Sequence, residues 1–295
     1  MNRSEIESAS RRIGGGSKAF LRETPLWRLP GSALGVGCAE VWLKLEHLQV
    51  GGSFKARGML NRLLANPMPA SGVIVASGGN AGIATATAAQ ALGVPAEIFV
   101  PAVISPAKRD RLEQLGARVV VTGAVYAEAF AACQQRQRES GALMTHAYDQ
   151  AEVLAGAGTL AREIESQAGV PDALLVSVGG GGLAGGIAAW FAGRTRMVAL
   201  EPERAPTLHA ALAAGGAGSP LGALMPVDGP GGAPQPGGGG NAVPAFSQLP
   251  SSSCTFSSAP RSTESSRPRR TSSVSRSTRS FTVVVPTRVE RESAS

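Results

Sequence analysis

One lysine in a glycine-rich turn has the residue type and the setting of a nucleophile. Lys55 lies in Gly51-Gly52-Ser53-Phe54-Lys55-Ala56-Arg57-Gly58, after the strand-like run Val41 to Leu45 and before the helix-like run Met59 to Leu64. Partial burial at such a junction favours the neutral amine over the ammonium ion, and the neutral amine is nucleophilic. An ordinary surface lysine in a loop is the alternative, because most lysine side chains are exposed.

A run of four glycines is suited to binding a phosphate. Gly179, Gly180, Gly181 and Gly182 follow the strand-like run Ala173 to Val178 and open the helix-like run Leu183 to Phe191. Without Cβ atoms the backbone can approach an anion, which its N–H groups and the positive end of the next helix would hold. A tight turn without a ligand is the alternative. The run lacks the Gly-Lys-Ser/Thr ending of a nucleoside-triphosphate loop, and no early GxGxxG supports a dinucleotide.

A second loop, Ser77-Gly78-Gly79-Asn80-Ala81-Gly82, is suited to binding a carboxylate. The Ser77 hydroxyl and a few backbone N–H groups are enough for two oxygens, although Ser77 or Asn80 could equally be a simple helix cap. A phosphate site, a carboxylate site and an activated lysine together describe an amino acid reacting on pyridoxal 5′-phosphate, with the lysine forming a Schiff base.

Strand-like and helix-like runs alternate around these loops, which predicts an open parallel sheet covered on both faces. The uncharged stretch from Ala173 to Gly193 is long enough to span a bilayer, but its four glycines would break a helix, so we predict strand, turn and helix there. The further predicted strands are 72–76, 96–100, 117–121 and 197–200, and the further predicted helices are 83–92, 106–115, 127–139 and 151–167.

In order and spacing, these motifs resemble those of the fold-type II pyridoxal-phosphate enzymes, and most closely the serine/threonine dehydratases. The resemblance rests on Ser53 to Gly58, Ser77 to Gly82 and Gly179 to Leu183, and covers roughly residues 20–210. Ala-Arg-Gly after the lysine favours the dehydratases over the cysteine-synthase and threonine-synthase branches, which usually carry Lys-Asp-Arg. The resemblance implies an α/β fold of the tryptophan synthase β type, with two open twisted parallel-sheet domains and the cofactor in the cleft.

The resemblance also implies roles for individual residues. Lys55 would hold the cofactor covalently and, once displaced by substrate, would remove the Cα proton, while Phe54 would pack on the pyridine ring and Asn80 would bond its 3′-oxygen. The phosphate would lie at Gly179, Gly180, Gly181, Gly182 and Leu183, and the substrate carboxylate at Ser77, Gly78, Gly79, Asn80 and Ala81.

The implied reaction is the dehydration of L-serine to pyruvate and of L-threonine to 2-oxobutyrate, with release of ammonia. A β-replacing synthase, an amino-acid racemase of the same fold and a catalytically inactive member are the alternatives. Some racemases of this family carry a serine two residues before the loop asparagine. That residue is Gly78 here, which cannot exchange a proton, so we expect dehydration without appreciable racemisation.

Glu201, Ala205 and Thr207 resemble the spacing of the family's cation site. A carboxylate, a backbone carbonyl and a hydroxyl suit a monovalent ion such as potassium, whereas a divalent site would favour an aspartate in place of Thr207. A glutamate that caps a helix or forms a salt bridge is the alternative. The three histidines share no ligand spacing and are interpreted as structural.

Charge and cysteine content predict the setting of the protein. The formal net charge is +7, but residues 251–295 hold eight arginines, three glutamates and no lysine, so most of this charge lies in the last segment. We therefore expect a small-molecule substrate and neither a nucleic acid nor a membrane as partner. Cys38, Cys133 and Cys254 are far apart, and no signal peptide is recognised, which favours the cytoplasm.

The periodic pattern stops near residue 206. Gly, Ala and Pro dominate residues 213–240, and residues 251–295 contain 15 serines, with one brief strand-like run at Phe281 to Val285. We expect a large cofactor domain from residues 1–49 and 148–205, a small domain from 50–147, and a low-complexity, disordered tail over 206–295. A reading-frame shift near residues 206–222 is a hypothesis for the change in composition, and a homodimer is expected if the fold is complete.

Overall fold

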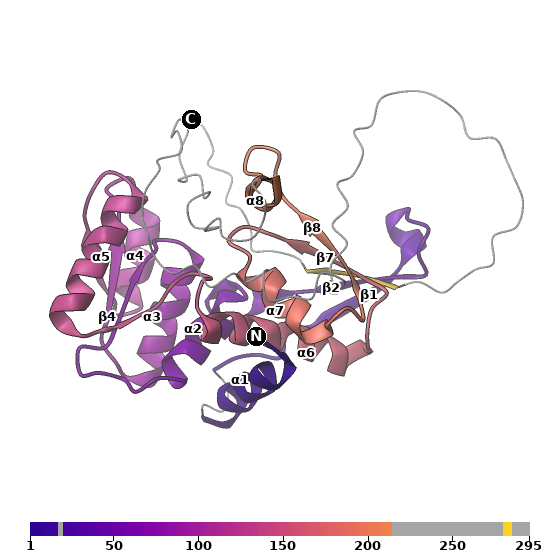
Figure 1. Cartoon of the computed structure of the whole chain (residues 1–295), viewed down its shortest axis with the longest axis horizontal. Coiled ribbons are helices and arrows are strands. Elements are labelled where there is room, and N and C mark those ends of the chain that lie inside the picture. Colours follow the sequence, from indigo (N-terminus) through magenta and orange to yellow (C-terminus); the bar gives the residue numbers. More distant parts are fainter. Residues whose placement is uncertain (17–19, 214–279, 285–295) are drawn as a thin grey trace, which may run out of the picture.

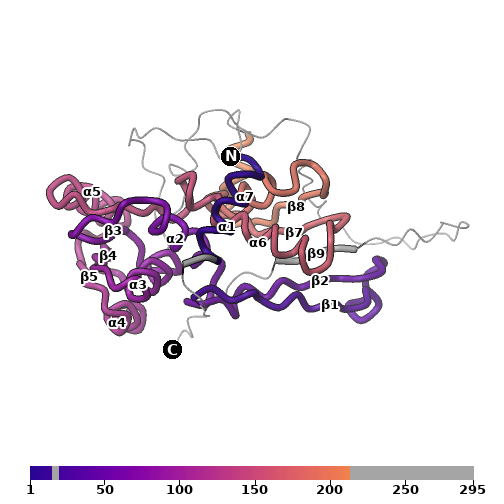
Figure 2. Tube along the Cα trace, turned by 90° about the horizontal axis from the view of Figure 1, so that it is seen from below, coloured from indigo at the N-terminus to yellow at the C-terminus, as the bar shows by residue number. Residues whose placement is uncertain are grey.

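The computed structural model describes residues 1–16, 20–213 and 280–284. Its strands form a five-stranded sheet of order β1-β2-β9-β7-β8 and a four-stranded sheet of order β5-β4-β3-β6. Figure 1 and Figure 2 show the two sheets at opposite ends, with helices α2, α6 and α7 between them. The strands are β1 (Leu26–Pro30), β2 (Glu40–Lys44), β3 (Val73–Ala76), β4 (Ala96–Val100), β5 (Arg118–Val121), β6 (Leu143–Met144), β7 (Ala173–Ser177), β8 (Arg196–Leu200) and β9 (Ser280–Val284). The α-helices are α1 (Arg3–Gly16), α2 (Lys55–Leu64), α3 (Asn80–Leu92), α4 (Pro106–Gln114), α5 (Tyr126–Ser140), α6 (Ala151–Ala168), α7 (Gly182–Phe191) and α8 (Thr207–Ala213).

The four-stranded sheet is parallel and has helices on both faces, and its central strand β3 is fully buried. Successive side chains of β3 alternate between two cores: Val73 and Val75 pack with α2, α3 and α4, while Ile74 and Ala76 pack with α5. Figure 2 shows α5 on one side of this sheet and α3 and α4 on the other. The continuous apolar run of β3 is what a parallel strand covered on both faces requires.

The five-stranded sheet differs from the expected parallel arrangement at one edge. β1 pairs antiparallel with β2, while β2, β9, β7 and β8 run parallel to one another. Strand β1 was not among the predicted strands. One face of β7 and β8 packs against α1, α6 and α7 in a core that includes Leu174, Ile187 and Trp190.

The predicted structureless tail contains two described elements. α8 follows β8 directly, and β9 lies between β2 and β7, in agreement with the strand-like run at Phe281 to Val285. Helix α8 and strand β9 are thus two described elements within the segment for which a low-complexity tail was expected. The remainder of the tail, including Cys254, lies outside the described residues.

Glycines inside the helices allow α6 to pack closely against both α2 and α7. A Cβ atom on Gly156 of α6 would lie 2.4 Å from the carbonyl oxygen of Arg57, and one on Gly58 of α2 would lie 2.8 Å from that of Val153. At the other crossing, a Cβ atom on Gly186 of α7 would lie 2.6 Å from the backbone of Gly158. Such contacts need glycine, because any side chain would force the backbones apart.

The predicted elements agree with the structure apart from two helix starts. α2 begins at Lys55 and α3 at Asn80, each a few residues before its expected start. In α2 the expectation failed because Gly58 was interpreted as part of a turn, whereas it is a helical residue at the crossing with α6. The stretch from Ala173 to Gly193 forms β7, a loop and α7, as predicted. Among the described residues, no helix combines the length and apolar character needed to cross a membrane.

Candidate active site

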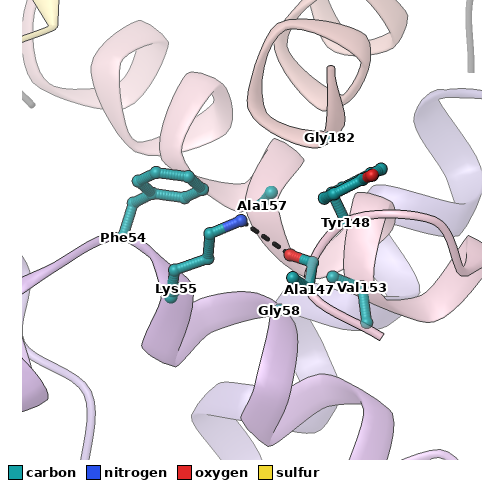
Figure 3. Close-up of a pocket in the computed structure, with 8 residues that line it drawn as sticks. All are labelled: Phe54, Lys55, Gly58, Ala147, Tyr148, Val153, Ala157 and Gly182. Atoms are coloured by element: carbon teal, nitrogen blue, oxygen red, sulfur yellow. Dashed lines mark hydrogen bonds between the residues drawn. The ribbon is translucent and has the colours of Figure 1, made fainter. Parts of the chain in front are cut away.

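A pocket lies where α2 and α7 begin and where the turn at residues 146–149 joins β6 to α6 (Figure 3). Lys55 extends into it from the first turn of α2, and Gly182 contributes the start of α7. The lining residues are Phe54, Lys55, Gly58, Ala147, Tyr148, Val153, Ala157 and Gly182. The close crossing of α2 with α6 and of α6 with α7 brings the predicted lysine and the predicted phosphate loop to one site.

Lys55 has the environment of an activated amine. Its Nζ atom donates a hydrogen bond of 2.6 Å to the carbonyl oxygen of Ala147, and it lies 4.9 Å from the centre of the Phe54 ring and 5.9 Å from that of Tyr148. Burial lowers the pKa of the Lys55 amine to about 8, because the pocket stabilises an ammonium ion less well than water does. About one tenth of such amines are neutral at pH 7, against fewer than about one in a thousand for an ordinary lysine.

The four-glycine loop connects β7 to α7 and packs against Tyr148. Gly181 has a φ of 83°, in the left-handed region that favours glycine. A Cβ atom on Gly180 would lie 2.3 Å from the Tyr148 ring, and one on Gly182 would lie 2.9 Å from the Tyr148 Cβ atom. Leu183 is buried in the core below the loop, and the Gly179 carbonyl oxygen lies 3.1 Å from the Thr207 hydroxyl, which shares its proton between this oxygen and the nearer Glu201.

These residues fit pyridoxal phosphate. A partly buried amine with a lowered pKa suits its aldehyde, and a loop closed to side chains at the start of α7 suits its phosphate. In the part of the chain that the structure describes, no three His, Cys, Asp or Glu side chains cluster as metal ligands would.

The predicted carboxylate loop lies at the end of β3 and the start of α3. The Ser77 hydroxyl accepts a hydrogen bond of 3.3 Å from the Gly79 N–H, and Gly79 and Asn80 are exposed. Ala81 is buried against Met59 and Val153, next to the lysine helix. None of residues 77–81 is among the described residues that line the pocket around Lys55.

Glu201, Ala205 and Thr207 come together at the start of α8, where the glutamate caps the helix. Glu201 accepts hydrogen bonds from the Thr207 hydroxyl (2.7 Å) and from the backbone N–H groups of Leu208 (2.5 Å) and His209 (3.0 Å). The Ala205 carbonyl accepts one of 3.0 Å from the Thr207 N–H. This is the capping arrangement that the sequence left open as an alternative to a cation site.

The turn at residues 146–149 was not predicted to belong to the site. Tyr148 contacts the glycine loop, Ala147 binds the lysine, and His146 lies behind them in a row of rings with Phe130. His146 was interpreted as structural, because no ligand spacing links it to the other histidines. The sequence carried no signal for its role, because the short strand β6, which ends at Met144 just before this turn, was not predicted.

A buried ionic cluster holds the lysine helix against the large sheet. Arg57, two residues after Lys55, donates to both oxygens of Glu46 (2.7 and 2.9 Å) and to Glu163 (2.8 Å). Lys44 donates to the other Glu163 oxygen (2.5 Å), and the Thr24 hydroxyl donates to Glu46 (2.6 Å). Two cations and two carboxylates balance one another, and they tie α2 to β2 and α6.

Comparison with known proteins identifies relatives of this chain. The L-threonine ammonia-lyase of Geobacter sulfurreducens is 40% identical over 182 residues, which is 59% of this chain and 45% of the relative. That of Thermotoga maritima is 34% identical over 181 residues, 60% of this chain and 45% of the relative. The chain thus spans about half the length of the curated relatives it matches.

Solved structures with the same fold include the threonine deaminase of T.th., with a TM-score of 0.66 and 35% identity over 73% of this chain and 70% of that one. Maize serine racemase has a TM-score of 0.68 and 29% identity over 72% of this chain and 65% of that one. The family model described as pyridoxal-phosphate dependent enzyme matches residues 18–233, which extends beyond the expected end of the resemblance. With its buried lysine, its glycine loop and this match, the chain belongs to the family of pyridoxal-phosphate dependent enzymes.

Proposed function

We propose that the chain is an ammonia-lyase that converts L-threonine to 2-oxobutyrate and L-serine to pyruvate. The observation that carries the proposal is the Lys55 amine, which lies in a pocket beside the glycine loop with its pKa lowered to about 8 by burial. The curated relatives named L-threonine ammonia-lyase support threonine as a substrate. L-Serine is included because it carries the same β-hydroxyl group on a smaller side chain.

Lys55 acts as the base in this proposal. Its neutral amine takes the proton from the substrate Cα atom, and the Ala147 carbonyl, 2.6 Å away, orients the amine. When bound, pyridoxal phosphate supplies an electron sink for the negative charge left at Cα. The β-hydroxyl then takes up a proton and leaves as water. The remaining 2-amino-2-enoic acid is released, rearranges to its imine, and is hydrolysed by a water molecule to the 2-oxo acid and ammonia.

The remaining site residues bind and orient. Backbone N–H groups of Gly179 to Leu183, with the start of α7, hold the phosphate, and Phe54 packs on the pyridine ring. The loop from Ser77 to Ala81, at the start of α3, binds the substrate carboxylate. The Asn80 side-chain amide forms a hydrogen bond with the 3′-oxygen on the pyridine ring.

An amino-acid racemase is the second candidate, since solved racemase structures resemble this fold. Racemisation needs a proton donor on the face of Cα opposite Lys55. Gly78 offers no such group, and a Cβ atom there would lie 3.0 Å from the Ile104 Cδ1 atom. A β-replacing synthase and an inactive member are distinguished by product analysis.

Further parts of the proposal concern the setting of the enzyme. We infer a cytoplasmic homodimer that binds a small amino acid and neither nucleic acid nor membrane. We also infer a potassium ion at Glu201, Ala205 and Thr207. Its binding would replace hydrogen bonds by which the Glu201 carboxylate caps α8. We also infer a domain division at residues 49/50 and 147/148, which is supported by the separation of β3 to β6 from β1, β2, β7 and β8, whereas β9 comes from the segment expected to be a tail.

The test is product release by the purified full chain. With pyridoxal phosphate and L-threonine or L-serine, 2-oxo acid and ammonia are measured for the wild type, for Lys55→Ala, and for Lys108→Ala as control. Lys108 is exposed on α4, so its replacement is expected to leave the rate unchanged, whereas Lys55→Ala abolishes turnover. A wild type that binds the cofactor but forms no 2-oxo acid contradicts the proposed function.

A further inference from the structure

The turn at residues 146–149 contacts both halves of the proposed cofactor site. On one side, the Ala147 carbonyl accepts the 2.6 Å hydrogen bond from Lys55. On the other side, the Tyr148 ring lies against the glycine loop, where a Cβ atom on Gly180 would come within 2.3 Å of it. Figure 3 shows Ala147 and Tyr148 on one side of the lysine amine and the Phe54 ring on the other, below the loop at Gly182. The position of the lysine amine relative to the phosphate loop therefore depends on the conformation of these four consecutive residues.

His146 fixes the shape of this turn. Its Nδ1 atom accepts hydrogen bonds from the backbone N–H groups of Asp149 (3.0 Å) and Tyr148 (3.4 Å), which places the ring proton on Nε2. Its own backbone N–H donates to the Gln150 side chain (2.9 Å), and its ring meets those of Tyr148 and Phe130 edge to face. Burial, with a smaller contribution from the nearby Lys55 charge, lowers the pKa of His146 to about 4, so the acceptor nitrogen is free at neutral pH.

We propose that His146 is a positioning residue, whose Nδ1 atom holds the 146–149 turn and thereby sets the Lys55 amine and the glycine loop at the spacing that the cofactor needs. This inference rests on the proposed binding of pyridoxal phosphate at Lys55 and the loop. It explains why a histidine without ligand spacing lies directly behind the site. It also assigns Tyr148 a role, as the ring that supports the glycine loop.

Two substitutions separate the acceptor nitrogen from the ring. His146→Asn keeps an acceptor, because the amide oxygen is bonded to Cγ as Nδ1 is, and Asn commonly accepts from backbone N–H groups two and three residues further on. His146→Phe keeps a flat ring between Phe130 and Tyr148 but leaves the N–H groups of the turn without their acceptor. A purely structural role in packing predicts that phenylalanine is the better replacement, and the proposed role predicts asparagine.

The experiment measures cofactor binding by the full chain, without turnover. Pyridoxal 5′-phosphate reports on both Lys55 and the loop, while pyridoxine 5′-phosphate has an alcohol in place of the aldehyde and reports on the loop alone. We expect His146→Asn to keep both dissociation constants within about threefold of the wild type, and His146→Phe to weaken both by about tenfold or more, as for the loss of a buried acceptor. In the cofactor-free protein, hydrogen exchange at Tyr148 and Asp149 is expected to accelerate in His146→Phe only.

Two results overturn the proposal among variants with unchanged circular dichroism. Wild-type binding by His146→Phe shows that the turn does not need the acceptor, and equal weakening by both variants shows that the ring is what positions the site. If His146→Phe does not fold, Tyr148→Leu tests whether the turn supports the glycine loop. We expect this variant to bind pyridoxine 5′-phosphate about tenfold more weakly, while the reactivity of its Lys55 toward a small amine-reactive reagent is unchanged. Unchanged binding by Tyr148→Leu contradicts the role of the ring.

The failure of this inference can be distinguished from failure of the proposed function. A wild type that binds both compounds but forms no 2-oxo acid refutes the ammonia-lyase activity. The role of His146 is still tested in that case, because the binding comparison of its variants does not depend on turnover. A wild type that binds neither compound overturns the inference itself, because the site on which it rests does not exist.

Discussion

Replacing Arg57 with methionine is expected to destabilise the fold, because it leaves a buried carboxylate without its counter-ion. The Arg57 side chain is 3% exposed and that of Glu46 is 2% exposed. Although burial alone would lower the pKa of the Arg57 guanidinium, Glu46 and Glu163 raise it above its ordinary value, so this residue is charged at every working pH. Methionine fills similar space but offers neither charge nor donors.

The size of the effect follows from what each carboxylate retains. Glu163 keeps its hydrogen bond from Lys44, but among the described residues the one hydrogen bond left to the Glu46 side chain is that from the Thr24 hydroxyl at 2.6 Å. Removing one partner of a buried pair costs about 3–5 kcal/mol. A typical domain is stable by about 5–15 kcal/mol, so Arg57→Met removes a large part of the free energy of unfolding. Adding Glu46→Gln removes the unpaired charge and is expected to restore at least about 1 kcal/mol.

Urea unfolding followed by tryptophan fluorescence measures this, since Trp42 and Trp190 are buried. Arg109→Ala is the matched control: its ion pair with Glu113 has side chains 52% and 45% exposed, so its loss is expected to leave stability unchanged within error. An Arg57→Met variant as stable as the wild type refutes the reasoning. So does a double variant that is no more stable than Arg57→Met.

Three further predictions concern the site. In the cofactor-free protein, the rate at which a small amine-reactive reagent labels Lys55 should rise with pH with a midpoint near 8, because burial disfavours the ammonium form. A midpoint near 10 contradicts the burial of the amine. Gly180→Ala should weaken pyridoxal phosphate binding about tenfold or more, since its Cβ atom would lie 2.3 Å from the Tyr148 ring. Gly14→Ala is the control, because a Cβ atom there would have nothing within 4 Å. Equal affinities of the two variants contradict the close approach of the loop to Tyr148. Because Gly78 has no side chain that could return a proton to Cα, chiral chromatography should find no D-serine formed from L-serine. Detection of D-serine shows that the enzyme also racemises and contradicts this prediction.

Much of the fold could be predicted because its signals are local. Short apolar runs followed by glycine-rich loops predicted β3 and β7 within a residue or two, since a parallel strand buried on both faces leaves a continuous apolar segment in the sequence. The strand order could not be predicted. β9 lies between β2 and β7 through backbone pairing with segments far away in the chain, and no local pattern encodes such a pairing.

The same contrast holds for the site. Lys55 and the glycine loop follow from residue type and spacing, and the structure brings Lys55 and Gly182 into one pocket. Ala147 could not be foreseen, because it acts through its backbone carbonyl, which every residue has. Tyr148 and His146 depend on how the turn after β6 folds back onto α7, a contact that is decided by tertiary packing.

The central claim is that Lys55 is the residue that carries pyridoxal phosphate. The chain contains four lysines, Lys18, Lys44, Lys55 and Lys108, so borohydride reduction of the cofactor-loaded protein followed by peptide mass spectrometry assigns the attachment site without ambiguity. We predict one pyridoxyl group per chain, on Lys55, and none in Lys55→Ala. Labelling of Lys108 or Lys18 in place of Lys55, or equal labelling of the wild type and Lys55→Ala, contradicts the account.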